Sequence, residues 1–253
     1  MEEYPIEGFL LVDKPADMTS FKCISHIRWL LPKKTKVGHT GTLDRFATGL
    51  LVVAVARSAT RVIPQIMPLD KTYIATGVLG QKTNTLDIMG DVVHAEKVPD
   101  ITRADIEKVL ESFGSGYTQI PPLFSALKHQ GVRLSDLART KEMSQSVLQK
   151  VAEKKSRLVK IYSLELLDFE SPRFTISAHV SHGTYIRVLV NDIAVKLGTC
   201  ATTHVLRRTV IGPFNVDKAI KLHDMNTHHE VDENLIPITT MVEKLEEYKS
   251  TII

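Results

Sequence analysis

The chain has 253 residues, of which 43% are hydrophobic and 24% are charged, so it can bury a large core and disorder is not expected. Its longest apolar run, residues 50–56, is about a third of a membrane span, and its first residues lack the basic-then-apolar pattern of a signal peptide, so we expect a cytoplasmic protein without membrane association. The formal charge of +3 is too small to indicate a nucleic-acid-binding protein by itself.

The first part of the chain predicts a strand, a helix, a loop and a second strand. Residues 8–13 form an apolar run typical of a buried strand. Either Thr19 or Ser20 can cap the helix that follows, which is expected to end near Pro32. A loop rich in glycine and threonine, residues 38–49, then leads into the apolar run at residues 50–56, which has the β-branched content of a central strand.

The remaining elements alternate between strands and helices. Alternating polarity predicts a strand at residues 71–79, and a capping pattern at Thr102 predicts a helix to residue 113. Two strands are expected at residues 158–169 and 174–181, and a helix at residues 185–197. Because the pattern shows neither a regular βαβ period nor repeats, it favours an α+β fold with a mixed, largely antiparallel central sheet flanked by helices.

Charge is distributed unevenly along the chain. Residues 217–253 carry a net charge of −4, so residues 1–216 carry +7. Residues 125–160 alone carry +6 and are interpreted as an insertion that forms helices or orders on binding. Taken alone, such a stretch is more often a solvated face than a phosphate-binding surface. Its basic side chains are Lys128, Arg133, Arg139, Lys141, Lys150, Lys154, Lys155, Arg157 and Lys160.

One short segment concentrates groups that could perform chemistry. Residues 38–44 contain two glycines, two threonines, a histidine and Asp44. The glycines Gly38 and Gly41 are predicted to allow backbone angles or a close approach that a Cβ would forbid. The same residues would also suit a tight turn in which Asp44 caps a helix. The segment alone leaves a catalytic loop and a structural turn equally open.

Two other groups are candidates with a simpler structural interpretation. Arg187, in the segment 181–187, falls on the flank of its predicted helix, where an arginine is usually solvated. It could instead hold a loop carboxylate ionised through a charge-assisted pair. Tyr73 follows Lys71 and Thr72 on a predicted strand, where an aromatic residue more often belongs to the core.

Several chemistries lack their sequence patterns. The chain has no GxGxxG, GxxxxGK[ST], HExxH or GxSxG motif. Cys23 and Cys200 are far apart and show no metal-ligand spacing, so both are expected to be packing residues in a reducing compartment. The adjacent His228 and His229 lie in a polar, acidic segment and are expected to be exposed. We therefore expect no metal.

Six sequence blocks occur in one order over roughly residues 8–214. The blocks are Asp13-Lys14-Pro15 with Thr19-Ser20, residues 38–44 with Ala47-Thr48-Gly49-Leu50, Lys71-Thr72-Tyr73, Gln119-Ile120-Pro121-Pro122 with Ser125-Ala126-Leu127-Lys128, Gly183-Thr184-Tyr185-Ile186-Arg187, and Leu206-Arg207-Arg208 with Gly212-Pro213-Phe214. Together they resemble the TruB family of pseudouridine synthases.

The resemblance implies a pseudouridine-synthase catalytic domain at residues 1–214, with the basic insertion at 125–160. Residues 215–253 would form a short extension in place of a full PUA domain, an RNA-binding module that many relatives carry. The implied substrate is the T-loop uridine of tRNA that becomes the Ψ of TΨC. The implied enzyme needs no cofactor and no obligatory protein partner, and we expect a monomer.

The resemblance also implies residue roles. Asp44 matches the catalytic aspartate, Arg187 would pair with it and keep it ionised, and Tyr73 would stack on the flipped base and take part in proton transfer. His39 would enter the T-loop where the uridine has left, and Leu206 would line the uracil pocket. Further substrate-binding residues would be Lys14 and Pro15, which support the loop, with Gly38, Thr40, Gly41 and Tyr185. The insertion would close over RNA and contact phosphates through Lys128, Arg133, Arg139, Lys154, Lys155 and Arg157.

The chain departs from the family pattern at three positions. Arg45 follows the aspartate where proline is usual, Asp17 replaces the glycine of DKPxGxTS, and Ser135 replaces a tyrosine in the insertion. Two alternatives to the tRNA enzyme are a non-catalytic tRNA-binding or folding factor on the same scaffold and a related isomerase that acts on other RNA within a protein complex. The joint presence of Asp44, Tyr73 and Arg187 favours the enzyme.

Overall fold

The computed structural model describes residues 6–125, 127–140 and 143–252 of the chain. Lys141 of the basic segment lies outside the described residues. The chain forms two compact units, residues 1–73 with 206–253 and residues 74–205. The chain passes from one unit to the other within β4 (Lys71–Leu79) and within β12 (Ala201–Ile211).

The first unit contains a mixed sheet with the strand order β14-β1-β3-β12. β1 and β3 are antiparallel, while β14 pairs with β1 and β12 pairs with β3 in parallel. β2 pairs with β3, and β13 pairs with β12. The strands are β1 (Gly8–Lys14), β2 (Val37–His39), β3 (Thr48–Val55), β13 (Phe214–Asn215), β14 (Ile220–Lys221) and part of β12. The α-helices are α1 (Ser20–Trp29), α2 (Ala56–Thr60), α3 (Ile63–Ile66), α8 (His228–Glu233) and α9 (Ile238–Ile252), with 3₁₀ turns η1 (Val216–Lys218) and η2 (Leu222–Asp224).

Alternate residues of β1 point into two separate cores of this unit. Phe9 and Leu11 pack in a cluster that includes Met241 and Leu245 of α9. Leu10 and Val12 pack in a second cluster with α1. Segments beyond residue 214 therefore contribute a strand and a buried helix face to the first unit, and the predicted domain boundary at 214 stays a prediction.

The second unit contains the strand order β4-β11-β10-β7 and two short hairpins, β5-β6 and β8-β9. Its strands are β5 (Gln81–Thr83), β6 (Val92–Ala95), β7 (Gly116–Gln119), β8 (Lys128–His129), β9 (Val132–Arg133), β10 (Arg157–Glu170), β11 (Arg173–Val180) and parts of β4 and β12. Its helices are α4 (Arg103–Glu111), α5 (Leu134–Thr140), α6 (Gln145–Glu153) and α7 (Ile186–Lys196).

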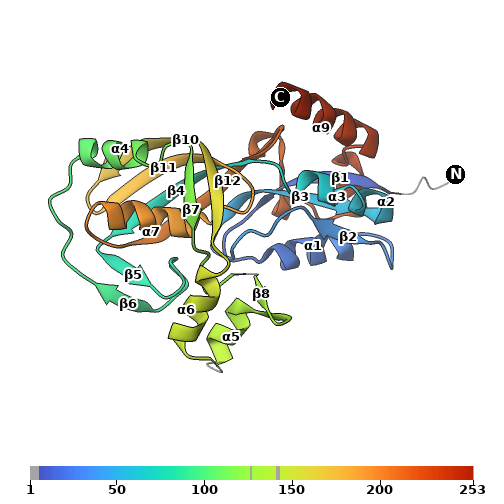
Figure 1. Ribbon diagram of the computed structural model, residues 1–253. Helices are drawn as coiled ribbons and strands as arrows, with labels where there is room; N and C mark the ends of the chain where they lie inside the picture. The colour runs from blue at the N-terminus through green and yellow to red at the C-terminus, as the bar shows by residue number, and fades with distance from the viewer. Residues whose placement is uncertain (1–5, 126, 141–142, 253) are drawn as a thin grey trace, which may run out of the picture. The chain divides into compact units, whose positions relative to one another are not determined.

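The structure confirms the predicted fold class, with mixed α and β elements and a mostly antiparallel sheet. Thr102 and Asp105 form the predicted capping box at the start of α4. The basic insertion forms the β8-β9 hairpin with α5 and α6 (Figure 1), which bury a small cluster of their own around Leu134, Leu137 and Leu148. Within the described part of the chain, no helix is long and apolar enough to cross a membrane.

Candidate active site

Asp44 lies on the irregular segment between β2 and β3, and its side chain is partly buried. The neighbouring Leu43 is fixed by Ser20, the first residue of α1. The Ser20 hydroxyl accepts a hydrogen bond from the Leu43 amide at 2.9 Å and donates to the Leu43 carbonyl at 3.2 Å. Thr19 is the residue that caps α1, because its hydroxyl accepts from the Lys22 amide. Ser20 therefore holds the loop that carries Asp44.

Lys14 supports the same loop through hydrogen bonds from its buried ammonium group. Its side chain is fully buried, and Nζ donates to the carbonyls of Pro15 and Met18 at 2.7 Å each and of Arg45 at 3.3 Å. Burial lowers the pKa of Lys14, while negative charge at Asp44 opposes that shift. One ammonium group thus connects the turn after β1 with the residue that follows Asp44.

Arg208 is a third support, and sequence reasoning did not identify its role. Its side chain is 1% exposed, with Nε donating to the Leu50 carbonyl at 2.8 Å and Nη2 donating to the Gly41 carbonyl at 3.1 Å. Gly49 lies beside it with φ of +102°, where an added Cβ would overlap the Arg208 backbone. The Leu206-Arg207-Arg208 block contained this signal, but burial of its second arginine was not predicted.

Gly38 and Gly41 differ in how much space a side chain would have at each position. A Cβ on Gly38 would lie 2.9 Å from Cδ1 of Ile63, so close approach explains that glycine. A Cβ on Gly41 would be 3.7 Å from Nη1 of Arg208, an ordinary contact, and Gly41 is not among the positive-φ glycines. Neither the backbone angles nor the contacts within this chain therefore require a glycine at position 41, contrary to the prediction.

His39 ends β2 and accepts a hydrogen bond at Nδ1 from the Gly41 amide at 3.3 Å. Burial, followed by the positive charge of Arg208, lowers its pKa, so the imidazole is neutral at pH 7. Thr40 is 1% exposed, and its hydroxyl has no hydrogen-bond partner among the described residues. Pro15 is partly buried after β1.

Two departures from the family pattern meet in this loop. Asp17 has a φ of +59°, the left-handed region in which a glycine is most easily accommodated. Arg45 Nε donates to the Asp17 carbonyl at 3.3 Å. The residue that replaces the usual proline therefore contacts the residue that replaces the usual glycine.

Tyr73 and Leu206 are also in the first unit, on β4 and β12. Tyr73 is 8% exposed and Leu206 is 5% exposed, so both are buried within this structure. Their predicted contacts with a flipped base stay predictions.

In the second unit, Arg187 is buried at the start of α7, so the simpler interpretation of a solvated side chain does not hold. Its Nη1 lies 3.2 Å from a carboxylate oxygen of Asp87 and also bonds the Thr85 carbonyl, and Nη2 donates to the Phe124 carbonyl at 3.0 Å. Asp87 is itself fixed by Thr85 and by the Met89 amide. No motif in the sequence indicated Asp87. The predicted pairing of Arg187 with Asp44 stays a prediction.

Tyr185 precedes α7 and is held by both of its backbone groups. The Gln119 side chain accepts from the Tyr185 amide at 2.8 Å and donates to its carbonyl at 3.2 Å. The Arg157 guanidinium lies 5.2 Å from the centroid of the Tyr185 ring and donates to the Gly183 carbonyl. Arg157 therefore positions Tyr185 as well as carrying positive charge.

The other predicted phosphate contacts differ in exposure. Lys128, Arg133, Arg139 and Lys154 are exposed, and Lys155 is partly buried. Arg139 lies 3.8 Å from Asp136, with both side chains at least half exposed. Solvent-exposed cations on a helical insertion are available to phosphate groups.

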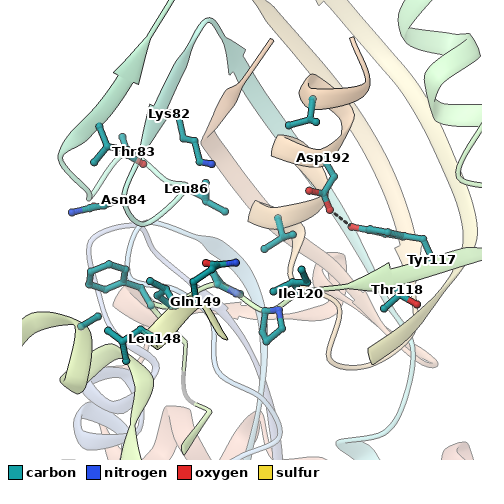
Figure 2. Close-up of a pocket in the computed structure, with 18 of the residues that line it drawn as sticks. Lys82, Thr83, Asn84, Leu86, Tyr117, Thr118, Ile120, Leu148, Gln149 and Asp192 are labelled. Atoms are coloured by element: carbon teal, nitrogen blue, oxygen red, sulfur yellow. Dashed lines mark hydrogen bonds between the residues drawn. The ribbon is translucent and has the colours of Figure 1, made fainter. Parts of the chain in front are cut away.

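The second unit also has a largely apolar pocket of about 940 Å³ between the insertion, the β5-β6 hairpin and α7. Figure 2 shows Tyr117 and Asp192 in its wall, with the Tyr117 hydroxyl donating to Asp192 at 2.9 Å. Burial raises the pKa of Asp192. Neither Tyr185 nor Arg187 lines this pocket, although Val188 from the same helix does.

Solved structures share this fold over most of the chain. A chain from a Cbf5-Nop10-Gar1 complex is 28% identical with a TM-score of 0.68, and the match covers 94% of this chain and 62% of that one. A chain from an H/ACA RNP bound to a substrate RNA is 25% identical with a TM-score of 0.65, covering 94% and 61%. This chain thus spans less than two thirds of the length of these structures.

Sequence relatives identify the family. A model for the TruB family pseudouridylate synthase N-terminal domain matches residues 28–186, and one for the tRNA pseudouridylate synthase B C-terminal domain matches residues 187–247. The chain is 41% identical to tRNA pseudouridine synthase B of Geobacter sulfurreducens, covering 86% of this chain and 68% of that one. It is 40% identical to the protein of that name in Syntrophotalea carbinolica, covering 97% and 76%. The chain belongs to the TruB family of pseudouridylate synthases.

Proposed function

We propose that this protein converts the T-loop uridine of tRNA to pseudouridine, with Asp44 as its catalytic carboxylate. The observation that carries the proposal is the support of the Asp44 loop by three buried groups, Lys14, Ser20 and Arg208. Such support holds one carboxylate in place, which is what electrostatic and nucleophilic catalysis require. Family membership and the names of the relatives supply the reaction and the substrate.

One carboxylate suffices for this reaction because no other reactant is consumed. The bond between ribose C1′ and uracil N1 breaks, and a bond from C1′ to C5 forms on the same base. The C5 proton is lost, N1 gains a proton, and no water or redox equivalent is used. Attack on the ribose, attack on the base and abstraction of a ribose proton remain alternative roles for Asp44.

Base flipping would bring the uridine out of its stack and into the site. We assign Tyr73 to stacking on the flipped base, Leu206 to the uracil pocket and His39 to the vacated space in the T-loop. The neutral state of His39 favours such insertion because no charge has to be desolvated. Exposed cations of the insertion, Lys128 and Lys154 among them, would contact phosphates.

The test is release of tritium from a T-arm stem-loop labelled at uracil C5, with no cofactor added. Asp44→Asn removes the charge with little change in volume, so we expect turnover to be abolished while binding of the stem-loop is retained. Asp17→Asn is the matched control, because Asp17 is an exposed acid that also interacts with Lys14. We expect the control to keep its activity.

The outcomes separate the candidate functions. Release by wild type and by Asp17→Asn, but not by Asp44→Asn, would support the proposed enzyme. Silence from wild type with binding intact would favour a non-catalytic tRNA-binding factor. Release from other RNAs in preference to the T-arm would indicate a related isomerase, a possibility that matters because the similar solved chain belongs to a Cbf5-Nop10-Gar1 complex. The monomeric state, the absence of an obligatory protein partner and the cytoplasmic location stay predictions.

A further inference from the structure

Three potential metal ligands from separate parts of the second unit converge at the edge of the β5-β6 hairpin. A ring nitrogen of His94, a carboxylate oxygen of Glu96 and Sγ of Cys200 all lie within 4.8 Å of one another. His94 and Glu96 come from β6 and the residue after it, and Cys200 directly precedes β12. Neither cysteine had been expected to take part in a metal site, because Cys23 and Cys200 are far apart and show no metal-ligand spacing.

The backbone holds two of these residues in fixed relation. The Gly80 amide donates to the Cys200 carbonyl at 2.9 Å, and the Glu96 amide donates to the Gly80 carbonyl at 2.9 Å. Gly80 has a φ of +80°, and a Cβ there would lie 2.8 Å from the Glu96 carbonyl oxygen. Gly80 therefore lets the two ligand-bearing segments approach, and the pair is preorganised before any ion binds.

The Glu96 carboxylate is the common partner of the surrounding donors. His94 Nε2 lies 3.2 Å from Oε2, and the Thr199 hydroxyl donates to Oε1 at 2.9 Å. The bond from Thr199 leaves Oε2 facing the imidazole, which is the arrangement in which an outer hydroxyl orients a metal-binding carboxylate.

We propose that His94, Glu96 and Cys200 bind one Zn²⁺ ion, with a water molecule as the fourth ligand. A sulfur, a nitrogen and an oxygen donor suit zinc, whereas calcium and magnesium prefer oxygen ligands alone. In a tetrahedral zinc site neighbouring ligand atoms are roughly 3.5 Å apart. His94 and Glu96 are already 3.2 Å apart, and closing the remaining spacings by at most about 1.3 Å is within reach of the His94 side chain, which is 56% exposed.

The ion would take the place of protons that the cluster now shares. Binding transfers the Cys200 S–H proton to solvent, and neutral His94 coordinates through the unprotonated Nε2. The ion would connect β6 to the segment after α7, so its role is stabilisation of the second unit.

The chain offers a matched control for each side of the site. Cys23 is the other buried free cysteine, in the first unit. His229 and Glu233 form a second exposed histidine–glutamate pair, at 3.1 Å, on α8. If the His94 cluster binds the ion, Cys200→Ser and His94→Ala will impair metal binding. Cys23→Ser and His229→Ala will bind the metal as wild type does.

The experiment is a Co²⁺ titration of the chelator-treated full chain, followed by absorption and then by displacement with Zn²⁺. We expect one equivalent to bind with a thiolate-to-cobalt charge-transfer band and tetrahedral d–d bands. Cys200→Ser should lose the charge-transfer band, and His94→Ala should weaken binding by at least about tenfold. Zn²⁺ should raise the Tm of wild type but not of His94→Ala.

Three results would overturn the proposal. They are a wild-type titration without the charge-transfer band, loss of the band in Cys23→Ser, and unchanged binding in His94→Ala. Because His94 is exposed, its replacement keeps the test valid even if Cys200→Ser does not fold.

Discussion

Ser20→Ala tests whether the Asp44 loop is held from α1. Ser20 is 2% exposed and Leu43 is 4% exposed, so the Leu43 amide and carbonyl lose their partner in a place where water does not replace it. Each buried backbone group left without a hydrogen bond costs about 1–3 kcal/mol. We therefore expect the free energy of unfolding to fall by about 2–6 kcal/mol.

The same change should reduce turnover, because Leu43 directly precedes Asp44. A displacement of a catalytic group by about 1 Å can cost on the order of 100-fold in rate. Tritium release from the T-arm stem-loop under single-turnover conditions should thus fall by about 10- to 100-fold. Affinity for the stem-loop should stay close to that of wild type, since Ser20 is buried and contributes no charge.

Thr19→Ala is the matched control for Ser20→Ala. Thr19 caps the same helix through the Lys22 amide, but it is exposed and does not contact Leu43 in the described hydrogen bonds. Its loss should cost about 1 kcal/mol and leave turnover unchanged. Urea unfolding measures both variants. If Ser20→Ala loses no more stability than Thr19→Ala and retains wild-type turnover, the loop is not held from α1 and the reasoning fails.

Three further changes test strain, a buried charge and the basic insertion. Asp17→Gly should stabilise the protein by about 1 kcal/mol, because φ is +59° there, while Asp17→Ala should not; equal urea midpoints would contradict this. Burial lowers the pKa of Lys71 from 10.5 to about 8, so between these pH values the unfolded state binds more protons than the folded state. The free energy of unfolding should therefore rise by about 3 kcal/mol from pH 8 to pH 10.5. Lys71→Met should lack this rise in urea unfolding measured across the same pH range. Replacing Lys154 and Lys155 with alanine should weaken stem-loop binding and reduce its salt slope by up to about 0.9 per lost phosphate contact, whereas Lys244→Ala on α9 should leave the slope unchanged.

Local patterns were sufficient for most elements and for the Asp44 loop. The capping box at Thr102 and the alternating polarity at β4 depend on neighbours within a few residues, so the sequence predicts them directly. The glycine and threonine content of residues 38–44 likewise indicated an ordered loop. The N-cap of α1 was ambiguous because Thr19 and Ser20 are both good caps. The structure resolves this, because Thr19 caps the helix while the Ser20 hydroxyl accepts a hydrogen bond from the Leu43 amide.

Burial of the charged residues could not be predicted from local patterns. For Arg187, on the flank of α7, the helical pattern taken alone favours a solvated side chain, but its partners at residues 85, 87 and 124 come from other segments of the chain. Arg208 is buried because carbonyls of Gly41 and Leu50 accept its guanidinium. Contacts of such long sequence separation depend on the assembled fold, and no helical or strand period contains them.

The position of Arg157 leads to a prediction that separates it from the lysines of the insertion. Its guanidinium lies over Tyr185 and bonds the Gly183 carbonyl, so it acts within the protein. An exposed cation–π contact is worth about 0.5–1 kcal/mol, which corresponds to a loss of turnover of up to about fivefold if Tyr185 acts in the reaction. Arg157→Lys should show this loss in single-turnover tritium release while keeping the salt slope of binding, because the charge is retained. A changed salt slope with full turnover would instead make Arg157 a phosphate contact.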